Sequence, residues 1–348
     1  MEKLPSVLDC TAYVTFSSVT IRGVIRTSDT SLSSTVLKRT VSFPSRRFTH
    51  HHKEPADTSM WPAASLPDTE RVLELELGKS LGHGRIGLAY IARVVGIRAR
   101  PDGELVDAPP GYPTDLCIKF ANPLYCRSMA REAWFYEQLP EEKFLQGVVV
   151  PRCYGFFTTQ LSADIAQRAK PWRKIKEWEF DNPVEGCDGV EFCEEGDFLP
   201  DDGEEDEGIV SDDARSRDTS MWNPWRPSAE APLLGVLITE RHGTSFPEDV
   251  WKNDEKAKED VKQMLRDLAL AGVYHGDIKY SNVLKARFVG SDVSAAECPR
   301  HKRVHNWRII DFDRSMRWAP DVGPDYRSMR NLDARFFLVE AVFWNLIS

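Results

Sequence analysis

Long apolar runs are absent from this sequence. No segment of its 348 residues reaches the roughly eighteen consecutive apolar residues of a membrane-spanning helix, so no membrane span is expected. Residues 336–344 form a shorter apolar run that contains Glu340, and we interpret it as part of a buried helix. The start of the chain also lacks a charged head followed by an apolar segment, because Glu2 and Asp9 intervene, which argues against a secretory leader.

Cysteines are few and do not follow a pairing pattern. The chain has 7 of them, an odd number, and contains no Cys-x-x-Cys pair. A disulfide framework is therefore not expected, and a reducing compartment is favoured. We accordingly expect an intracellular protein, either cytoplasmic or nuclear.

Basic residues are missing from one long segment. Residues 177–214 contain 17 Asp or Glu and no Lys or Arg, whereas the net charge of the chain is −9. The rest of the chain is thus mildly basic, but its charge is too diffuse to indicate nucleic-acid binding. We interpret about 158–231 as a mostly disordered insertion, because its composition cannot bury enough apolar surface to offset chain entropy. Deletion of 177–214 should then leave the melting temperature nearly unchanged.

Hydrophobic periodicity predicts strands followed by helices. Residues 1–66 are rich in Ser, Thr and Arg, and we expect a disordered or weakly structured extension there, although 11–26 could pair as strands. The expected strands are 72–77, 88–95, 116–120, 148–150 with 154–157, 233–239 and 306–310. The expected helices are 127–139, 254–272 and, for the most part, 325–346.

The strongest chemical signal follows the amphipathic helix expected over 254–272. The next loop contains four polar residues at close spacing, namely His275, Asp277, Lys279 and Asn282. Phosphoryl transfer needs a proton acceptor, a cation at the transferred phosphate and a metal ligand, and these residue types can supply them. Downstream, an apolar strand leads into Asp311, a second carboxylate that is suited to Mg²⁺.

Three further motifs lie upstream of this loop in the sequence. Residues 82–87 have the pattern G-x-G-x-x-G between two expected strands, which favours a hairpin over phosphates. Lys119 lies in the next strand, and Glu132, with Glu137 as the alternative, lies in the following helix. Residues 239–243 follow an apolar strand, where backbone groups could bind an adenine ring.

In this order, the motifs resemble those of the protein-kinase-like superfamily over about residues 77–317. The resemblance implies an α+β, bilobal protein-kinase-like fold, with an antiparallel-sheet N-lobe over 67–239 and a short helical C-lobe over 240–348. It also implies an ATP- and Mg²⁺-dependent kinase, a phosphotransferase with an alcohol group as acceptor, and in the first place a protein serine/threonine kinase-like enzyme.

The resemblance assigns a role to each motif residue. Asp277 would be the catalytic base and Lys279 the catalytic cation, while Asn282 and Asp311 would bind the metal. The implied ATP-binding residues are Gly82, Gly84, Gly87, Lys119, Glu132, Glu240 and His242.

The sequence departs from ordinary protein kinases at several points. Gly276 replaces the Arg that usually precedes the catalytic Asp, Asp313 replaces a Gly, and only 35 residues follow it. The acceptor could therefore be a protein hydroxyl or a small-molecule hydroxyl. A pseudokinase, which binds nucleotide or a partner without turnover, is the alternative of a different class. Turnover is favoured because all four residues that phosphoryl transfer requires are present, namely Lys119, Asp277, Asn282 and Asp311.

A second cluster has metal-like spacing. Cys298, His301 and His305 could bind zinc, but they supply three groups and no fourth is evident in the sequence. We therefore expect a basic surface loop there.

Overall fold

The computed structural model describes residues 15–26, 32–48, 66–139, 145–172, 197–202, 217, 219–287 and 296–318. Within them the strands are β1 Ser18–Arg26, β2 Leu32–Arg39, β3 Arg47–Phe48, β4 Val72–Gly84, β5 Gly87–Arg98, β6 Leu105–Val106, β7 Asp115–Ala121, β8 Cys153–Gln160, β9 Leu233–Glu240, β10 Val273–Tyr274, β11 Val283–Lys285, β12 Trp307–Ile309 and β13 Met316–Trp318. The helices are α1 Cys126–Gln138, α2 Ala163–Ala166, α5 Glu248–Asn253 and α6 Glu255–Leu270, with short 3-10 turns η2 Pro123–Tyr125 and η4 Tyr280–Asn282.

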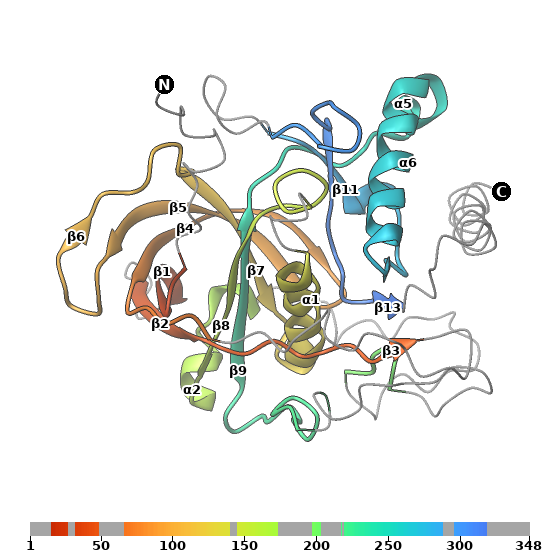
Figure 1. Ribbon diagram of the computed structural model, residues 1–348. Helices are drawn as coiled ribbons and strands as arrows, with labels where there is room; N and C mark the ends of the chain where they lie inside the picture. Colours follow the sequence, from red (N-terminus) through yellow and green to blue (C-terminus); the bar gives the residue numbers. More distant parts are fainter. Residues whose placement is uncertain are drawn as a thin grey trace.

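Seven strands form a closed barrel of mixed direction (Figure 1). Around the barrel they follow the order β4-β1-β2-β8-β9-β7-β5, and β5 pairs again with β4 to close it, while β6 extends from β5. The pair β1–β4 is parallel, and the other barrel pairs are antiparallel. Inward side chains from both halves fill the interior, among them Val19, Leu75 and Ile118, which are fully buried.

The expected bilobal protein-kinase-like fold, with an antiparallel-sheet N-lobe and a short helical C-lobe, is therefore wrong. The sheet does not stay open, because β1 enters in parallel beside β4 and links it to β2 and β8. After β9, the described residues contain only α5 and α6 as α-helices, together with the short strands β10, β11, β12 and β13. Strand β11 pairs with β12, and β13 pairs with β10 and with β3 from the start of the chain. Such a chain has no helical lobe among its described residues. The boundaries drawn near residues 66 and 239 stay predictions.

The Ser- and Thr-rich start of the chain differs most from its expected disorder. Strand β1 alternates buried Val19 and Ile21 with Thr20 and Arg22, which point outward, as a half-buried strand should. Gly23 has a φ of 90° at the point where the β1–β2 register shifts, a conformation that glycine adopts without strain. Alternating β-branched residues thus build a barrel strand from a composition that resembles a disordered tail.

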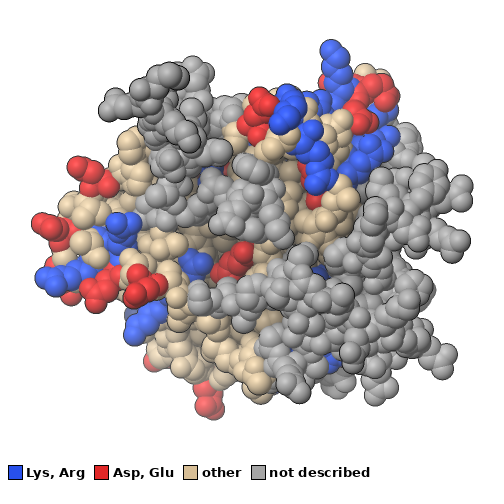
Figure 2. Space-filling model, viewed as in Figure 1, with Lys and Arg blue, Asp and Glu red and all other residues tan. Residues whose placement is uncertain are grey.

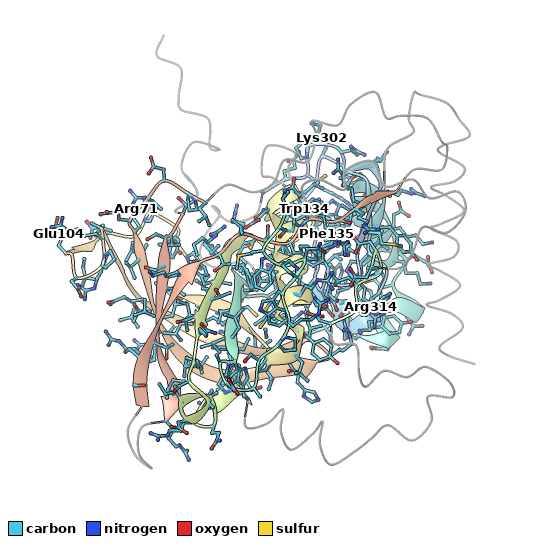
Figure 3. All side chains as sticks on the ribbon, turned by 90° about the horizontal axis from the view of Figure 1, so that it is seen from below. Arg71, Glu104, Trp134, Phe135, Lys302 and Arg314 are labelled. Carbon is cyan, nitrogen blue, oxygen red and sulfur yellow. The ribbon has the colours of Figure 1, made fainter. Side chains whose placement is uncertain are left out.

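Helix α1 is the central buried helix. It packs against β8 and β9, and Met129, Ala133 and Trp134 on it belong to a core that also includes residues of α6 (Figures 1 and 3). In Figure 3, Trp134 and Phe135 of α1 lie between Arg71 and Glu104 on one side of the molecule and Arg314 on the other. The expected helix over 127–139 is confirmed, and it places Glu132 close to the barrel strand β7.

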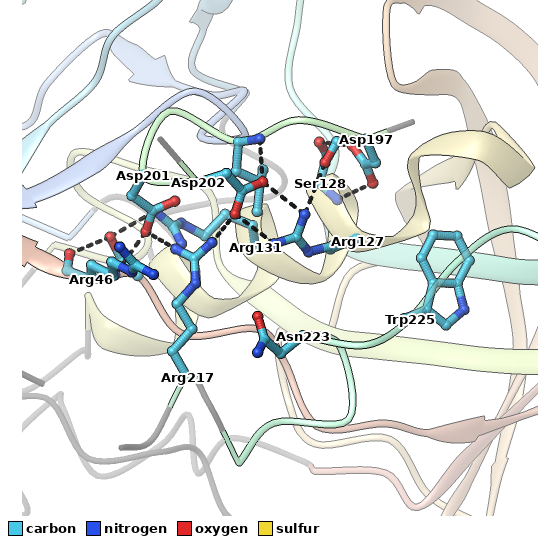
Figure 4. A network of polar contacts seen from close by, with 12 residues as sticks. Arg46, Arg127, Ser128, Arg131, Asp197, Asp201, Asp202, Arg217, Asn223 and Trp225 are labelled. Atoms are coloured by element: carbon cyan, nitrogen blue, oxygen red, sulfur yellow. Dashed lines mark hydrogen bonds and ion pairs between the residues drawn. The ribbon is translucent and has the colours of Figure 1, made fainter. Parts of the chain in front are cut away.

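Residues 197–202 of the acidic segment pack against the first half of α1 (Figure 4). Asp197 accepts a hydrogen bond from the backbone N–H of Ser128 at 2.6 Å. The side chain of Asp201 is fully buried, and its Oδ2 lies 2.6 Å from Nη2 of Arg131. The carboxylate of Asp202 accepts hydrogen bonds from two nitrogens of the Arg127 guanidinium. The interpretation of 158–231 as mostly disordered is wrong for these residues, and the dispensability expected for 177–214 conflicts with their contacts.

Helix α6 follows the sequence signals closely. Asp254 caps it by accepting hydrogen bonds from the N–H groups of Lys256 and Ala257, and Gly272 follows its end with a φ of 80°. The surface over α5 and α6 has a mixture of acidic and basic side chains (Figure 2). No helix in the described part of the chain is long and apolar enough to cross a membrane. The helix expected over 325–346 lies outside the described residues.

Candidate functional site

A half-buried lysine connects three elements of the molecule. Lys119 extends from β7, and its Nζ lies 2.7 Å from Glu132 Oε2 on α1 and 2.5 Å from Asp311 Oδ1, just after β12. Asp311 is 192 positions away from Lys119 in the sequence. The structure therefore brings together three of the residues that the motifs singled out.

The charges of this cluster shift one another's pKa values. Burial alone would lower the pKa of Lys119, but the carboxylates of Asp311, Glu132 and Asp313 outweigh it and raise that pKa. Burial raises the pKa of Glu132 to about 7, although Lys119 opposes this. Asp311 has a lowered pKa because the ammonium of Lys119 outweighs the effect of burial. Lys119 and Asp311 thus form the charged pair of the cluster.

The loop between β10 and β11 holds Asp277 at its exposed edge. Lys279 Nζ lies 2.8 Å from Asp277 Oδ2, and Asn282 Nδ2 donates to the Asp277 backbone oxygen at 2.8 Å. In turn, the backbone oxygen of Asn282 accepts from the N–H of Ile310 at 2.9 Å, one residue before Asp311. Asp277, Asn282 and Asp311 therefore belong to one hydrogen-bonded unit.

His275 is a buried support of this unit. Its Nε2 lies 2.8 Å from the carbonyl oxygen of Ile310, which can only accept, so Nε2 bears the hydrogen. Its Nδ1 then accepts the backbone N–H of Asp277 at 3.3 Å. Burial lowers the pKa of His275, which keeps the ring in this neutral form. One ring thus orients both the Asp277 and the Asp311 backbone.

Gly276 explains one departure noted in the sequence. Its φ is 76°, and a Cβ atom there would lie 2.3 Å from the carbonyl oxygen of Arg314, whose position Figure 3 labels. The backbone leaves no space for the Arg that ordinary protein kinases have at this point. The glycine is therefore a requirement of the close approach between the two loops.

Asp311 has a backbone conformation that is unusual for its type. Its φ is 73°, in the left-handed region, which costs a non-glycine residue free energy and is enriched at functional sites. The next residue, Phe312, is fully buried and stacks on Phe135 of α1 with ring centroids 6.4 Å apart. Phe312 thus fixes the turn that directs the Asp311 carboxylate toward Lys119.

The glycine hairpin joins the cluster through a residue that the motif did not mark. Arg85, at the tip between β4 and β5, forms an ion pair with buried Asp313. Asp313 occupies the position where ordinary protein kinases have a Gly, and no local signal in the sequence links it to Arg85. Of the three glycines, Gly87 is sterically required, because a Cβ there would lie 2.0 Å from Phe120 O. Gly82 and Gly84 have no atom within 4 Å of such a Cβ, so the tip is open above them.

The segment expected to bind adenine has competing contacts. The backbone N–H of Glu240 donates to the carbonyl oxygen of Arg152 at 2.8 Å, and its carboxylate accepts from Arg152 at 2.9 Å. His242 is buried, and neither ring nitrogen has a hydrogen-bond partner within the described residues. Adenine binding at Glu240 and His242 stays a prediction. The backbone N–H of Glu240 already donates to Arg152, so it is not free to donate to an adenine ring.

The buried state of His242 predicts a pH-dependent stability. Burial, reinforced by nearby Arg308 and Arg152, lowers its pKa to about 4 from an ordinary value near 6.5. The unfolded chain then binds the proton more tightly, so the stability is present above pH 6.5 and is lost as the pH falls toward 4. We expect His242 to lower the free energy of unfolding by about 2 kcal/mol when the pH falls from 7 to 5. Urea unfolding of wild type and His242→Leu at both pH values measures it, and an equal loss in both proteins would contradict it.

Comparison with known proteins provides no family for the chain. No protein-family model matches it, and no curated protein matches it either. The resemblance to the protein-kinase-like superfamily is therefore wrong as a statement of family and fold, since the barrel closes and no family model supports the assignment. What the chain does has to be argued from the site itself.

Proposed function

We propose that this site transfers the terminal phosphoryl group of ATP, with Mg²⁺, to a hydroxyl acceptor. The observation that supports it best is Lys119, whose Nζ contacts Glu132 and Asp311 at 2.7 and 2.5 Å. A lysine fixed by a carboxylate next to a second carboxylate is the arrangement that positions a triphosphate and its metal ion.

Each side chain of the site has a defined task in this proposal. Asp277, partly exposed, accepts the proton of the attacking hydroxyl while the hydroxyl oxygen forms the new bond to phosphorus. The bond between phosphorus and the ADP oxygen breaks, and its electron pair leaves with ADP. Lys279, 2.8 Å from Asp277, offsets the negative charge that develops on the transferred group.

The metal-binding role falls to oxygen atoms that suit a hard cation. Asn282 uses its Nδ2 to hold the Asp277 backbone, which leaves its amide oxygen as a ligand atom. Asp311 offers a second carboxylate oxygen besides the one that Lys119 contacts. Mg²⁺, when bound, neutralises charge on the phosphates. Two oxygen donors from the protein are typical of Mg²⁺ sites that also use the phosphates of the substrate.

Nucleotide binding is the first expected result. Mg²⁺-ATP should raise the thermal unfolding temperature, with a stabilisation of about 2.7 kcal/mol when its concentration is 100 times the Kd. Lys119→Met should weaken this binding at least tenfold, because it removes the cation that meets the phosphates. Lys170→Met, at an exposed lysine, serves as the matched control and should bind normally. The absence of any shift at millimolar Mg²⁺-ATP would overturn the proposal.

Turnover separates the enzyme from a nucleotide-binding scaffold. Labelled ATP is offered with generic protein acceptors and with small-molecule alcohols, and transfer to either class supports the proposal and identifies the acceptor. Binding of Mg²⁺-ATP without transfer or hydrolysis would overturn the enzymatic part of it.

A further inference from the structure

Four potential metal ligands meet between α6 and the loop that leads into β12. They are Asp267, Cys298, His301 and His305, and one ligand atom from each lies within 4.8 Å of every other. The sequence suggested three of them, and the missing fourth, Asp267, lies on α6. Asp267, Cys298 and His305 are at most 5% exposed, so this is not the surface loop that we expected.

The distances between the ligand atoms match a tetrahedral site. His301 Nδ1 lies 3.3 Å from Cys298 Sγ, 3.2 Å from His305 Nε2 and 3.4 Å from Asp267 Oδ2. Cys298 Sγ lies 3.7 Å from the same Asp267 oxygen. Ligand atoms placed about 2.0–2.3 Å from a tetrahedral zinc ion are about 3.3–3.8 Å apart. These four distances therefore fit one coordination sphere, and the remaining pairs of ligand atoms lie within 4.8 Å.

The chain forms a tight turn that brings two of these ligands together. The N–H of Cys298 donates to the Arg303 carbonyl oxygen at 2.8 Å, and the N–H of Lys302 donates to the Cys298 carbonyl oxygen at 2.8 Å. Lys302, labelled in Figure 3, has a φ of 52°, which reverses the chain after His301. A non-glycine residue in this conformation is uncommon, and here it folds His301 back onto the thiol.

Asp260 provides the support that metal-bound histidines usually have. Its Oδ1 lies 2.5 Å from His305 Nδ1, and its Oδ2 accepts the backbone N–H of Asn306 at 2.8 Å. Because a carboxylate can only accept, His305 Nδ1 bears the hydrogen and Nε2 presents its lone pair toward His301 and the thiol. A carboxylate that orients a histidine in this way is a regular feature of zinc sites.

We propose that Asp267, Cys298, His301 and His305 bind one zinc ion. A thiolate, two imidazoles and a carboxylate are ligands that zinc accepts, and all four positions are filled by the protein. A closed set of this kind is structural, because no position is left for water or substrate. The ion would fasten α6 to the turn before β12, the strand that leads into Asp311. This inference is independent of the proposed phosphotransferase activity.

Zinc content and cobalt spectroscopy test the proposal on the full chain. Protein purified without chelators should contain about one zinc per chain, measured by elemental analysis. Replacing zinc with Co²⁺ should give the absorption bands of a tetrahedral site with a thiolate ligand. Cys298→Ala should abolish both signals, whereas Cys153→Ala, at another buried thiol on β8, should leave them unchanged.

Asp260→Asn keeps all four ligands and tests the site without removing any of them. It should lower the zinc affinity about 10- to 100-fold in competition with a chromophoric chelator. Removal of zinc by a chelator should also lower the melting temperature of wild type, because metal binding is linked to folding. Wild type that binds no more zinc or cobalt than Cys298→Ala would overturn the proposal. If Cys298→Ala does not fold, an unchanged zinc affinity in Asp260→Asn would overturn it.

Discussion

Replacing Asp277 by Asn should lower the rate of phosphoryl transfer by about 10²- to 10⁴-fold, the range that positioned proton transfer usually contributes. The amide keeps the size of the side chain and a hydrogen bond to Lys279, which lies 2.8 Å from Asp277 Oδ2. The backbone oxygen of Asp277 stays in place to accept from Asn282. Geometry is thus preserved while the group that accepts the hydroxyl proton is lost.

Asp311→Asn should produce a different result from the same assays. Its carboxylate contacts Lys119 and is proposed to bind the metal, so both Mg²⁺-ATP binding and turnover should fall. In Asp277→Asn, by contrast, binding in a thermal-shift titration should barely change. Asp164→Asn, an exposed acid on α2, is the matched control and should retain full activity. Turnover that is real but unaffected in Asp277→Asn would show that another group is the base.

Local signals predicted one contact of the site, the pair of Lys119 and Glu132. Lys119 and Glu132 lie on adjacent elements, 13 positions apart, so a strand followed by a helix is enough to bring them together. The N-cap at Asp254 is also a local feature, since its carboxylate accepts hydrogen bonds from N–H groups in the first turn of the same helix. The contact between Lys119 and Asp311 was not predicted, because 192 positions separate the two residues and no local signal links them.

Barrel closure could not be predicted because it depends on a long-range parallel pair. In the β1–β4 pair, Val19 aligns with Leu73 across a sequence separation that no turn signal connects. Alternation along a strand identifies the strand and its buried face, but it does not specify the partner. The same limit hid Asp267, which reads as an ordinary polar residue of α6 until the turn at Cys298 is placed beside it.

The composition of the acidic segment predicts disorder only as an average over its residues, and single residues can depart from it. Most of its acidic side chains have no described structure, yet Asp201 is as buried as any apolar core residue. Part of the positive charge of the rest of the chain lies directly beside this carboxylate. Arg131 and Arg217 surround Asp201, and Arg127 and Arg217 both lie over the ring of Phe43 with 4.9 Å to its centroid. Charge complementarity at a few buried positions therefore outweighs a composition typical of disorder.

Asp201→Asn should accordingly destabilise the protein by about 3–5 kcal/mol, since it removes the carboxylate that pairs with the buried guanidinium of Arg131, whereas Arg217 keeps its ion pair with Asp202. The side chains of Asp201 and Arg131 are completely buried, and that of Arg217 is 2% exposed. The Asp201 carboxylate also accepts the backbone N–H of Arg46 at 2.8 Å, which ties the segment to the strand region before β3. Urea unfolding at neutral pH measures the loss, and Asp107→Asn, an exposed acid, should change the stability by less than about 0.5 kcal/mol.

The pH dependence gives this prediction an independent test. Burial would raise the pKa of Asp201, but Arg131 and Arg217 outweigh it and lower that pKa to about 2. Because the folded-state pKa is lower than the unfolded value near 3.9, the stabilisation is present above pH 4 and is lost as the pH falls toward 2. Wild type should thus lose stability steeply in that range, and Asp201→Asn should lose less. A loss below about 1 kcal/mol in Asp201→Asn at neutral pH, with an unchanged acid profile, would mean that the buried ion pairs of Asp201 add little to the stability of the folded state.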